Sequence, residues 1–251
     1  MQITTLIWDT DKFNTMPEDE RILVTFIGHV RNEVLILEKL LSLSTTFAHT
    51  NRSIDAINAS QSLLISKLTA GKLWEGWELL HSFFTLGSKA PKYPVAEQAL
   101  SQPARDALNQ LKNHFADGGV INVLRNQFAF HYMAGNLKKY PPQATEDEPL
   151  EIVVTEKDEP FSIFSEGLIL NVILSKIEKT DADKAFEKMV EDVMRAAHAF
   201  AHFCNECLLS FADKYSLELS RTQHDLPNLE YNRKLEAPFL FSDFTKSSRS
   251  K

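Results

Sequence analysis

The sequence predicts an all-α fold, a helical bundle of about five or six helices with a small β-hairpin insertion near 151–165. Apolar residues recur at spacings of three and four over long stretches, which is the period of an amphipathic helix. Residues that favour helix starts precede several of these stretches, and proline or glycine pairs separate them. The chain has 251 residues, 43% of them hydrophobic, and a chain of this size buries a core without disulfides or metals.

The first long helix is expected over 17–47. Thr15 is positioned as its cap, Pro17 suits the first turn, and Glu18 completes a capping box. The apolar stripe of this helix is Ile22, Phe26, Val30, Val34, Leu37 and Leu41. Before it, residues 3–8 either form a short strand or pack without regular structure.

A second long helix is expected over 53–86, with Ser53 as its cap. Gly71 and Gly76 each weaken a helix by roughly 1 kcal/mol relative to alanine, so we expect a bend near 70–76. The predicted buried face is Ile54, Ile57, Leu64, Leu68, Trp74, Trp77, Leu80 and Phe84.

Four further helices are indicated by the same signals. Ser101 caps the first of them with Pro103 in its first turn, Ser165 is a candidate cap for the third, and Asp181 caps the last. The apolar run of the third would also suit a strand. These helices are expected over 102–116, 119–134, 168–179 and 182–216.

The stretch over 135–160 is acidic and is interrupted by Pro141-Pro142. Two β-prone segments lie near the end of this stretch, at 152–154 and 161–164. They would pair as a hairpin, with a solvated loop as the alternative. Residues 219–251 are polar without steady periodicity, so we expect a flexible C-terminal tail after a single domain over 1–218.

Charge and cysteine content exclude several classes of protein. The net charge of −7 argues against a broad basic surface for duplex DNA or bulk RNA, but it is compatible with one local phosphate site. Cys204 and Cys207 are the only cysteines, which indicates a reducing compartment and no disulfide framework. No run reaches about 18 apolar residues and the N-terminal residues lack a secretory pattern, so we expect a cytoplasmic protein without a membrane partner.

The helix expected over 119–134 carries the candidate catalytic residues Arg125, Asn126 and His131. Arginine grips phosphate in a planar fork, and histidine transfers protons near neutral pH. On an ideal helix Arg125 and His131 lie roughly 120° apart around the axis and roughly 9 Å along it. They would converge if the arginine curled toward the histidine, or if two copies met across a two-fold axis. The alternative is structural, with a core histidine and an arginine paired to a carboxylate.

Arg125-Asn126 followed by His131 resembles the signature of the HEPN superfamily, in which a histidine follows an arginine after four to six residues. The resemblance implies a helical domain that often forms a homodimer with both motifs lining one cleft. It also implies a metal-independent endoribonuclease of the toxin or antiphage type, with RNA and an antitoxin-like protein as partners and no cofactor or metal. By this resemblance Arg125 would hold the scissile phosphate, and Asn126 would orient either the phosphate or the catalytic pair. His131 would act as general base or acid. Other members only bind, so a non-catalytic helical interaction module is the alternative. This chain departs from a minimal domain of the family in its acidity and its inserted acidic stretch.

Other groupings are assigned to structure. His198, His202, Cys204 and Cys207 resemble a zinc cluster, but a straight helix places the cysteines on the far side from the histidines. Buried cysteines and histidines are predicted, with a two-histidine metal site completed by another helix as the alternative. Arg31-Asn32-Glu33 is interpreted as the polar face of the first helix. Trp74 and Trp77 would suit stacking on bases, but their helical spacing favours core packing.

Overall fold

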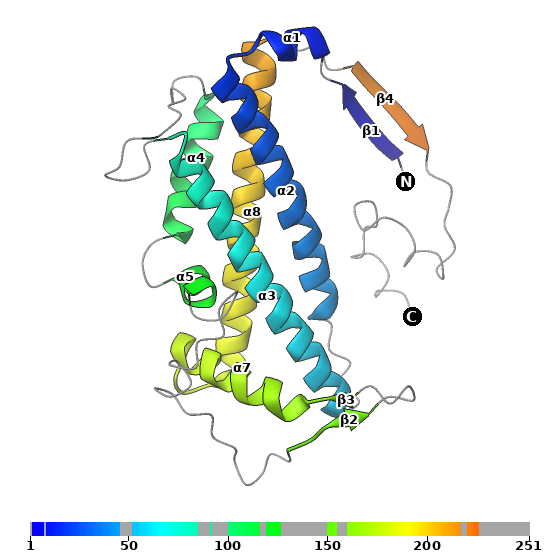
Figure 1. The fold of residues 1–251 in the computed structure, drawn as a ribbon, viewed down its shortest axis with the longest axis vertical. Coiled ribbons are helices and arrows are strands. Elements are labelled where there is room, and N and C mark those ends of the chain that lie inside the picture. The colour runs from blue at the N-terminus through cyan, green and yellow to red at the C-terminus, as the bar shows by residue number, and fades with distance from the viewer. Residues whose placement is uncertain are drawn as a thin grey trace.

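The computed structural model describes residues 2–7, 9–45, 52–84, 91, 100–115, 119–126, 150–154, 160–216 and 220–225. Within these residues the protein is an elongated helical bundle (Figure 1), which confirms the all-α prediction. The helices are α1 (Thr10–Thr15), α2 (Glu18–Ser44), α3 (Arg52–His81), α4 (Gln102–His114), α5 (Val120–Leu124), α7 (Ile163–Ile177) and α8 (Ala182–Lys214).

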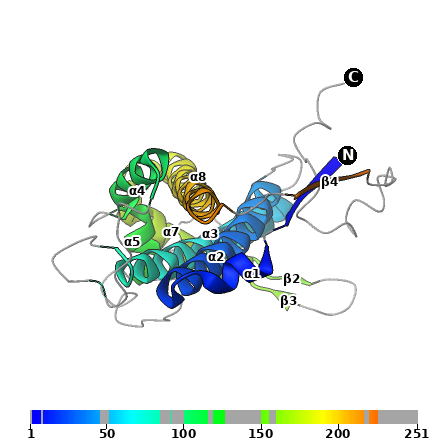
Figure 2. The same ribbon diagram turned by 90° about the horizontal axis from the view of Figure 1, so that it is seen from above.

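The core of the bundle forms around α8, the longest of the described helices at 33 residues. Helices α2, α3, α4 and α7 all pack against α8, while α2 and α3 also pack against each other. The short helix α5 contacts α3, α7 and α8, and it lies on the far side of α3 from α2 (Figure 2). Large fully buried side chains from several of these helices meet in the core, among them Leu23, Leu73, Phe200 and Phe203.

Two antiparallel strand pairs accompany the helices. Strands β2 (Val153–Val154) and β3 (Pro160–Phe161) pair, which confirms the predicted hairpin near 151–165. Strands β1 (Gln2–Ile7) and β4 (Ser220–Asp225) also pair, with Gln2 opposite Asp225 and Ile7 opposite Ser220. The second pair joins the N-terminal segment to a segment assigned above to the polar tail.

The helix starts follow the predicted caps in two cases. The hydroxyl of Ser101 accepts a hydrogen bond from the Ala104 amide at 3.3 Å, and the Asp181 carboxylate accepts one from the Lys184 amide at 3.0 Å. Both bonds satisfy amides that a helix N-terminus leaves without an intrahelical partner.

The predicted cap at Thr15 is wrong. Asp9 caps a separate short helix, α1, which ends at Thr15, and the Thr15 hydroxyl donates to the Lys12 carbonyl at 2.7 Å. Helix α2 then begins after Pro17 without a side-chain cap. The third later helix, α7, is indeed a helix, but it starts at Ile163 and so before the candidate cap Ser165.

The predicted buried face of α3 is wrong in part, because Ile54 is 50% exposed and Leu64 is 53% exposed. Phe26 of the first helix is likewise 46% exposed. The buried face of α3 instead carries many small side chains, with Leu63 and the larger side chains near the end of the helix among them. These small residues are Ser60, Ser62, Ser66, Thr69, Ala70, Gly71 and Gly76.

Small residues on α3 let neighbouring helices approach closely. A Cβ added at Gly76 would lie 2.5 Å from Cζ of Phe200 and 2.9 Å from Cγ1 of Val30. The Ser62 hydroxyl donates to the Ser44 hydroxyl at 3.0 Å, so the contact with α2 also satisfies a buried polar group. Helix α3 continues unbroken through Gly71 and Gly76, and Gly76 is needed for packing against α2 and α8.

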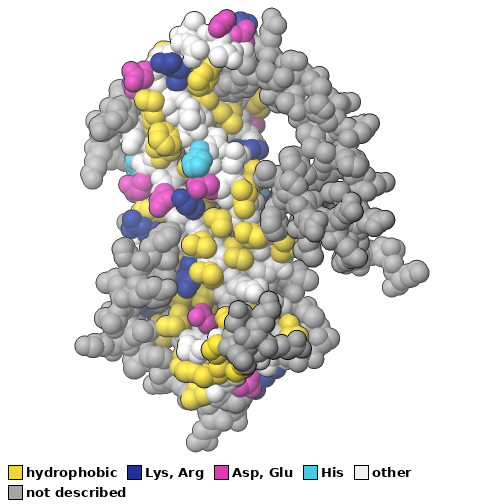
Figure 3. Space-filling view, turned by 45° about the vertical axis from the view of Figure 1, so that its right-hand side comes forward, with side chains coloured by type: hydrophobic (Ala, Val, Ile, Leu, Met, Phe, Trp, Pro, Cys, Tyr) yellow, Lys and Arg dark blue, Asp and Glu magenta, His cyan; other side chains and the backbone are white. Residues whose placement is uncertain are grey.

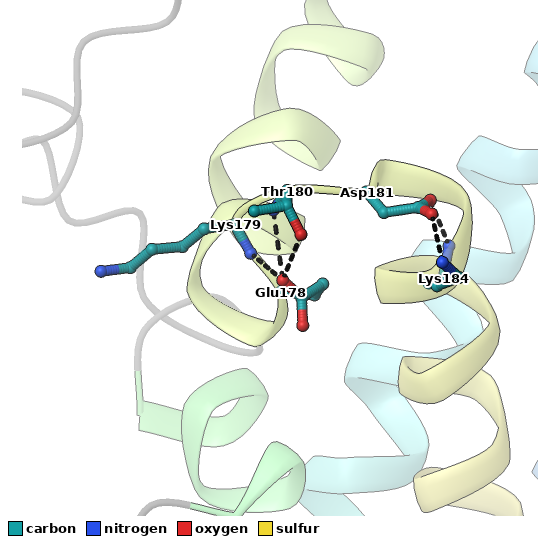
Figure 4. Close-up of polar contacts among 5 residues, drawn as sticks. All are labelled: Glu178, Lys179, Thr180, Asp181 and Lys184. Carbon is teal, nitrogen blue, oxygen red and sulfur yellow. Dashed lines mark hydrogen bonds and ion pairs between the residues drawn. The ribbon is translucent and has the colours of Figure 1, made fainter.

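The turn between α7 and α8 is held by two carboxylates (Figure 4). Glu178 accepts hydrogen bonds from the Thr180 hydroxyl at 2.9 Å, the Thr180 amide at 3.2 Å and the Lys179 amide at 2.9 Å. Asp181 caps α8, and its carboxylate also lies 3.0 Å from Nζ of Lys184. Hydrogen bonds from Thr180 lower the pKa of Glu178, and those from Lys184 lower the pKa of Asp181.

These lowered pKa values predict a loss of stability in acid. A carboxyl whose pKa is lower in the folded state stabilises the protein above its unfolded pKa, and this contribution disappears as the pH falls through the folded value. Urea midpoints measured at several pH values below about 4.5 should therefore fall less steeply in Glu178→Gln and Asp181→Asn than in the parent. Urea midpoints that fall equally steeply with pH in the parent and in both variants would contradict the stabilising role of these two carboxylates.

Candidate functional site around Arg125

Helix α5 positions the described part of the predicted motif. Val120, Ile121 and Leu124 are buried and anchor α5 on α3, α7 and α8. Arg125 follows with helical dihedral angles, φ −62° and ψ −51°, and both Arg125 and Asn126 are exposed. The three buried side chains hold one side of α5 against the bundle, and Arg125 lies at the surface.

The Arg125 side chain lies over an aromatic ring. Its guanidinium carbon is 5.2 Å from the centroid of the Trp74 ring, which is within range of a cation–π interaction. Nη1 of Arg125 donates a hydrogen bond to Oδ1 of Asn126 at 2.5 Å, and Nδ2 of Asn126 donates to Oδ1 of Asn122. No ion pair joins Arg125 to a carboxylate among the described residues. The contacts with Trp74 and Asn126 therefore orient the guanidinium, and its other N–H groups can donate hydrogen bonds to an anion.

An aromatic column beneath Arg125 fixes the position of Trp74. The rings of Trp74 and Phe115 have centroids 6.3 Å apart, and Phe115 stacks on Trp77 at 4.8 Å with an interplanar angle of 6°. His81 meets the edge of Trp77 at 5.2 Å. Trp77 is buried, as the core interpretation predicted, and so is Phe115. Trp74 is half-buried and lies beneath the guanidinium.

His131, the third predicted site residue, lies outside the described residues, as do all positions over 127–149. The structure therefore describes two of the three predicted residues and brings these two together. Sequence reasoning missed Asn122, although its position four residues before Asn126 on one helix is a signal for such a contact. It assigned Trp74 to the core without linking it to Arg125, because a contact between separate helices leaves no pattern in spacing.

A second histidine close to this column is His114 at the end of α4. Burial lowers the pKa of His114, and the nearby Arg195 guanidinium lowers it further. His114 directly precedes Phe115 in the sequence, and its surroundings disfavour the protonated imidazole.

The candidate metal ligands on α8 point in opposite directions, as predicted. His198 is exposed and lies 2.7 Å from the Glu38 carboxylate, and His202 is exposed and lies 4.0 Å from Glu206. Cys204 and Cys207 are fully buried, which confirms the predicted burial of the cysteines, and burial raises the pKa of both thiols. The predicted burial of the two histidines is wrong, since their side chains are 66% and 55% exposed. Within the described part of the chain, no three His, Cys, Asp or Glu side chains are grouped to hold a metal ion.

Comparison with protein-family models, curated proteins and solved structures finds no match for this chain. Among the described residues, no helix combines the length and apolar character required to cross a bilayer.

Proposed function

We propose that this protein is a HEPN-like, metal-independent endoribonuclease that uses Arg125, Asn126 and His131. The observation that carries the proposal is the Arg125 guanidinium, which is exposed, held over Trp74 and free of an ion-pair partner among the described residues. An arginine in this state binds phosphate at a low cost in side-chain entropy, because part of its freedom is already lost.

The proposed reaction is transfer of a phosphodiester to the neighbouring 2′-hydroxyl of RNA. The 2′-oxygen attacks phosphorus, the bond from phosphorus to the 5′-oxygen breaks, and a 2′,3′-cyclic phosphate and a 5′-hydroxyl are formed. His131 accepts the proton of the 2′-hydroxyl while water protonates the leaving 5′-oxygen, or it donates a proton to that oxygen while water accepts the proton of the 2′-hydroxyl. Arg125 binds the non-bridging oxygens and stabilises the charge that grows on them. Asn126 orients the guanidinium through the hydrogen bond described above.

The net charge of −7 favours recognition at one or two phosphates over binding along a long backbone. Single-stranded or looped RNA is the substrate class that fits, because its backbone bends freely enough to present one linkage to a small site.

The test is incubation of the purified protein with a panel of single-stranded and hairpin RNAs in EDTA. We expect cleavage by the parent and none by His131→Ala, with unchanged helicity by circular dichroism. Absence of cleavage by the parent across the panel, with and without divalent ions, would overturn the proposal.

A second candidate is the non-catalytic helical interaction module, in which the helix that carries Arg125 forms the partner interface and Arg125 serves structure. The cation–π contact of Arg125 with Trp74 favours it, because such a contact also suits an arginine that stabilises the fold. Under this alternative Arg125→Ala would lower the melting temperature or weaken binding of the partner, and RNA would remain intact. Cleavage of RNA that depends on His131 would exclude it as the sole function.

A further inference from the structure

Helix α2 carries an outward stripe of side chains beside its contact with α3. The stripe consists of Ile22, Phe26, His29, Glu33, Ile36 and Leu40, at alternating spacings of four and three residues. This spacing keeps side chains on one face over several turns and is the pattern of helices that pair with another helix. Phe26 is 46% exposed and Ile36 is 36% exposed, so large apolar side chains on this stripe face solvent.

The middle of the stripe is polar. Nε2 of His29 lies 3.7 Å from the Glu33 carboxylate, and Nζ of Lys72 on α3 lies 3.4 Å from the same group. Figure 3 shows this arrangement on the surface, with hydrophobic side chains above and below a group of histidine, acidic and basic side chains. The order along the helix is thus apolar, charged, apolar.

The order apolar, charged, apolar is the same from either end of the helix. The stripe is therefore complementary to a second copy of itself that runs in the opposite direction. If a second copy of α2 lies antiparallel with the two-fold axis near Arg31, Phe26 faces Ile36 of the second copy and Ile22 faces its Leu40. In that register His29 faces Glu33 of the second copy, and Glu33 faces its His29. A two-fold interface requires this reciprocity.

The stripe is separate from the site at Arg125. Glu33 contacts Lys72, whereas Arg125 lies over Trp74. Lys72 and Trp74 are two residues apart on α3, and an ideal helix therefore turns roughly 200° between them. The α2 stripe and Arg125 thus lie on opposite sides of α3. Pairing through α2 leaves both Arg125 sites open to solvent, unlike the shared cleft that the family resemblance implies.

We propose that the protein forms an antiparallel homodimer through the α2 stripe, with Phe26 against Ile36 and His29 against Glu33 across the two-fold axis. Charge complementarity at the centre fixes the register, and the apolar layers on either side supply the burial. The proposal does not depend on RNA cleavage, so either can fail without the other.

Disulfide cross-linking tests the register directly. Positions 26 and 36 of one chain lie roughly 15 Å apart along the axis at about 1.5 Å per residue, too far to be bridged within one helix. The double variant Phe26→Cys/Ile36→Cys should form a covalent dimer on mild oxidation, as should a mixture of the two single variants. Each single variant alone should remain uncross-linked, and the buried native thiols of Cys204 and Cys207 should not interfere. No cross-link in the double variant, or equal cross-linking of either single variant alone, would overturn the proposal.

Sedimentation equilibrium provides an independent readout. The parent should sediment as a dimer, and Phe26→Asp and Ile36→Asp should each shift it to monomer with helicity retained. Leu209→Asp is the matched control, because Leu209 is equally exposed at 46% but lies on α8. A monomeric parent at tens of micromolar, or a dimer that survives both α2 substitutions, would contradict the α2 interface.

Discussion

Alanine in place of Arg125 is expected to slow RNA cleavage by about 10²–10³-fold, the usual effect of removing one group that stabilises transition-state charge. The guanidinium is exposed and makes few contacts that support the fold, so the melting temperature should change little. Single-turnover rates with saturating RNA, compared with thermal unfolding by circular dichroism, measure the two effects separately.

Two controls sharpen this result. Arg125→Lys keeps the positive charge but loses the planar fork, so its rate should lie between those of the parent and Arg125→Ala. Arg195→Ala removes another exposed arginine, one that pairs with Asp192 on α8 and carries no predicted role in cleavage, and it should cleave at the parental rate. Equal rates for Arg125→Ala and the parent would contradict the role assigned to the guanidinium.

Alanine in place of Gly76 is expected to destabilise the protein by about 1–3 kcal/mol, the usual cost of overpacking a core. The added methyl group would lie within 2.9 Å of both Phe200 and Val30, so α2 or α8 must move away from α3. The gain in helix propensity, roughly 1 kcal/mol, opposes this effect but does not cancel it. Urea unfolding followed by circular dichroism gives the difference.

Gly28→Ala is the matched control, since Gly28 lies inside α2 and a Cβ there has no neighbouring atom within 4 Å. This variant should be more stable than the parent by about 0.5–1 kcal/mol. Stabilisation of both variants would show that α3 does not approach its neighbours as closely as the structure indicates.

The helices could be predicted from the sequence because their signals are local. Ser101 and Asp181 bond to amides three residues ahead, and each bond involves one turn of chain. Apolar spacing of three and four then indicates the extent of α2, α4 and α8 to within a few residues. The hairpin of β2 and β3 is local in the same sense.

The buried face of α3 could not be predicted in the same way. Ile54 and Leu64 lie on its outer side, while its core side includes small residues such as Ser62, Ser66 and Gly76 beside buried leucines. A rule that places apolar residues inside selects the wrong side when close helix packing requires small ones. The pairing of β1 with β4 was missed because its partners are separated by almost the whole chain.

In the candidate site, too, the local features could be predicted and the contact between distant segments could not. The exposure of Arg125 beside the anchoring residues of α5 follows from the local pattern. Its contact with Trp74 joins two helices far apart in sequence and required the structure.

The proposed chemistry is tested most directly by replacing the attacking group of the substrate. An RNA cleaved by the protein in EDTA should become resistant at that linkage when the single 2′-hydroxyl next to the scissile phosphate is replaced by hydrogen. The products of the unmodified RNA should carry a 2′,3′-cyclic phosphate and a 5′-hydroxyl. Equal cleavage of the modified and unmodified strands, or no cleavage of either, would contradict the assignment of Arg125 and His131 to phosphodiester transfer.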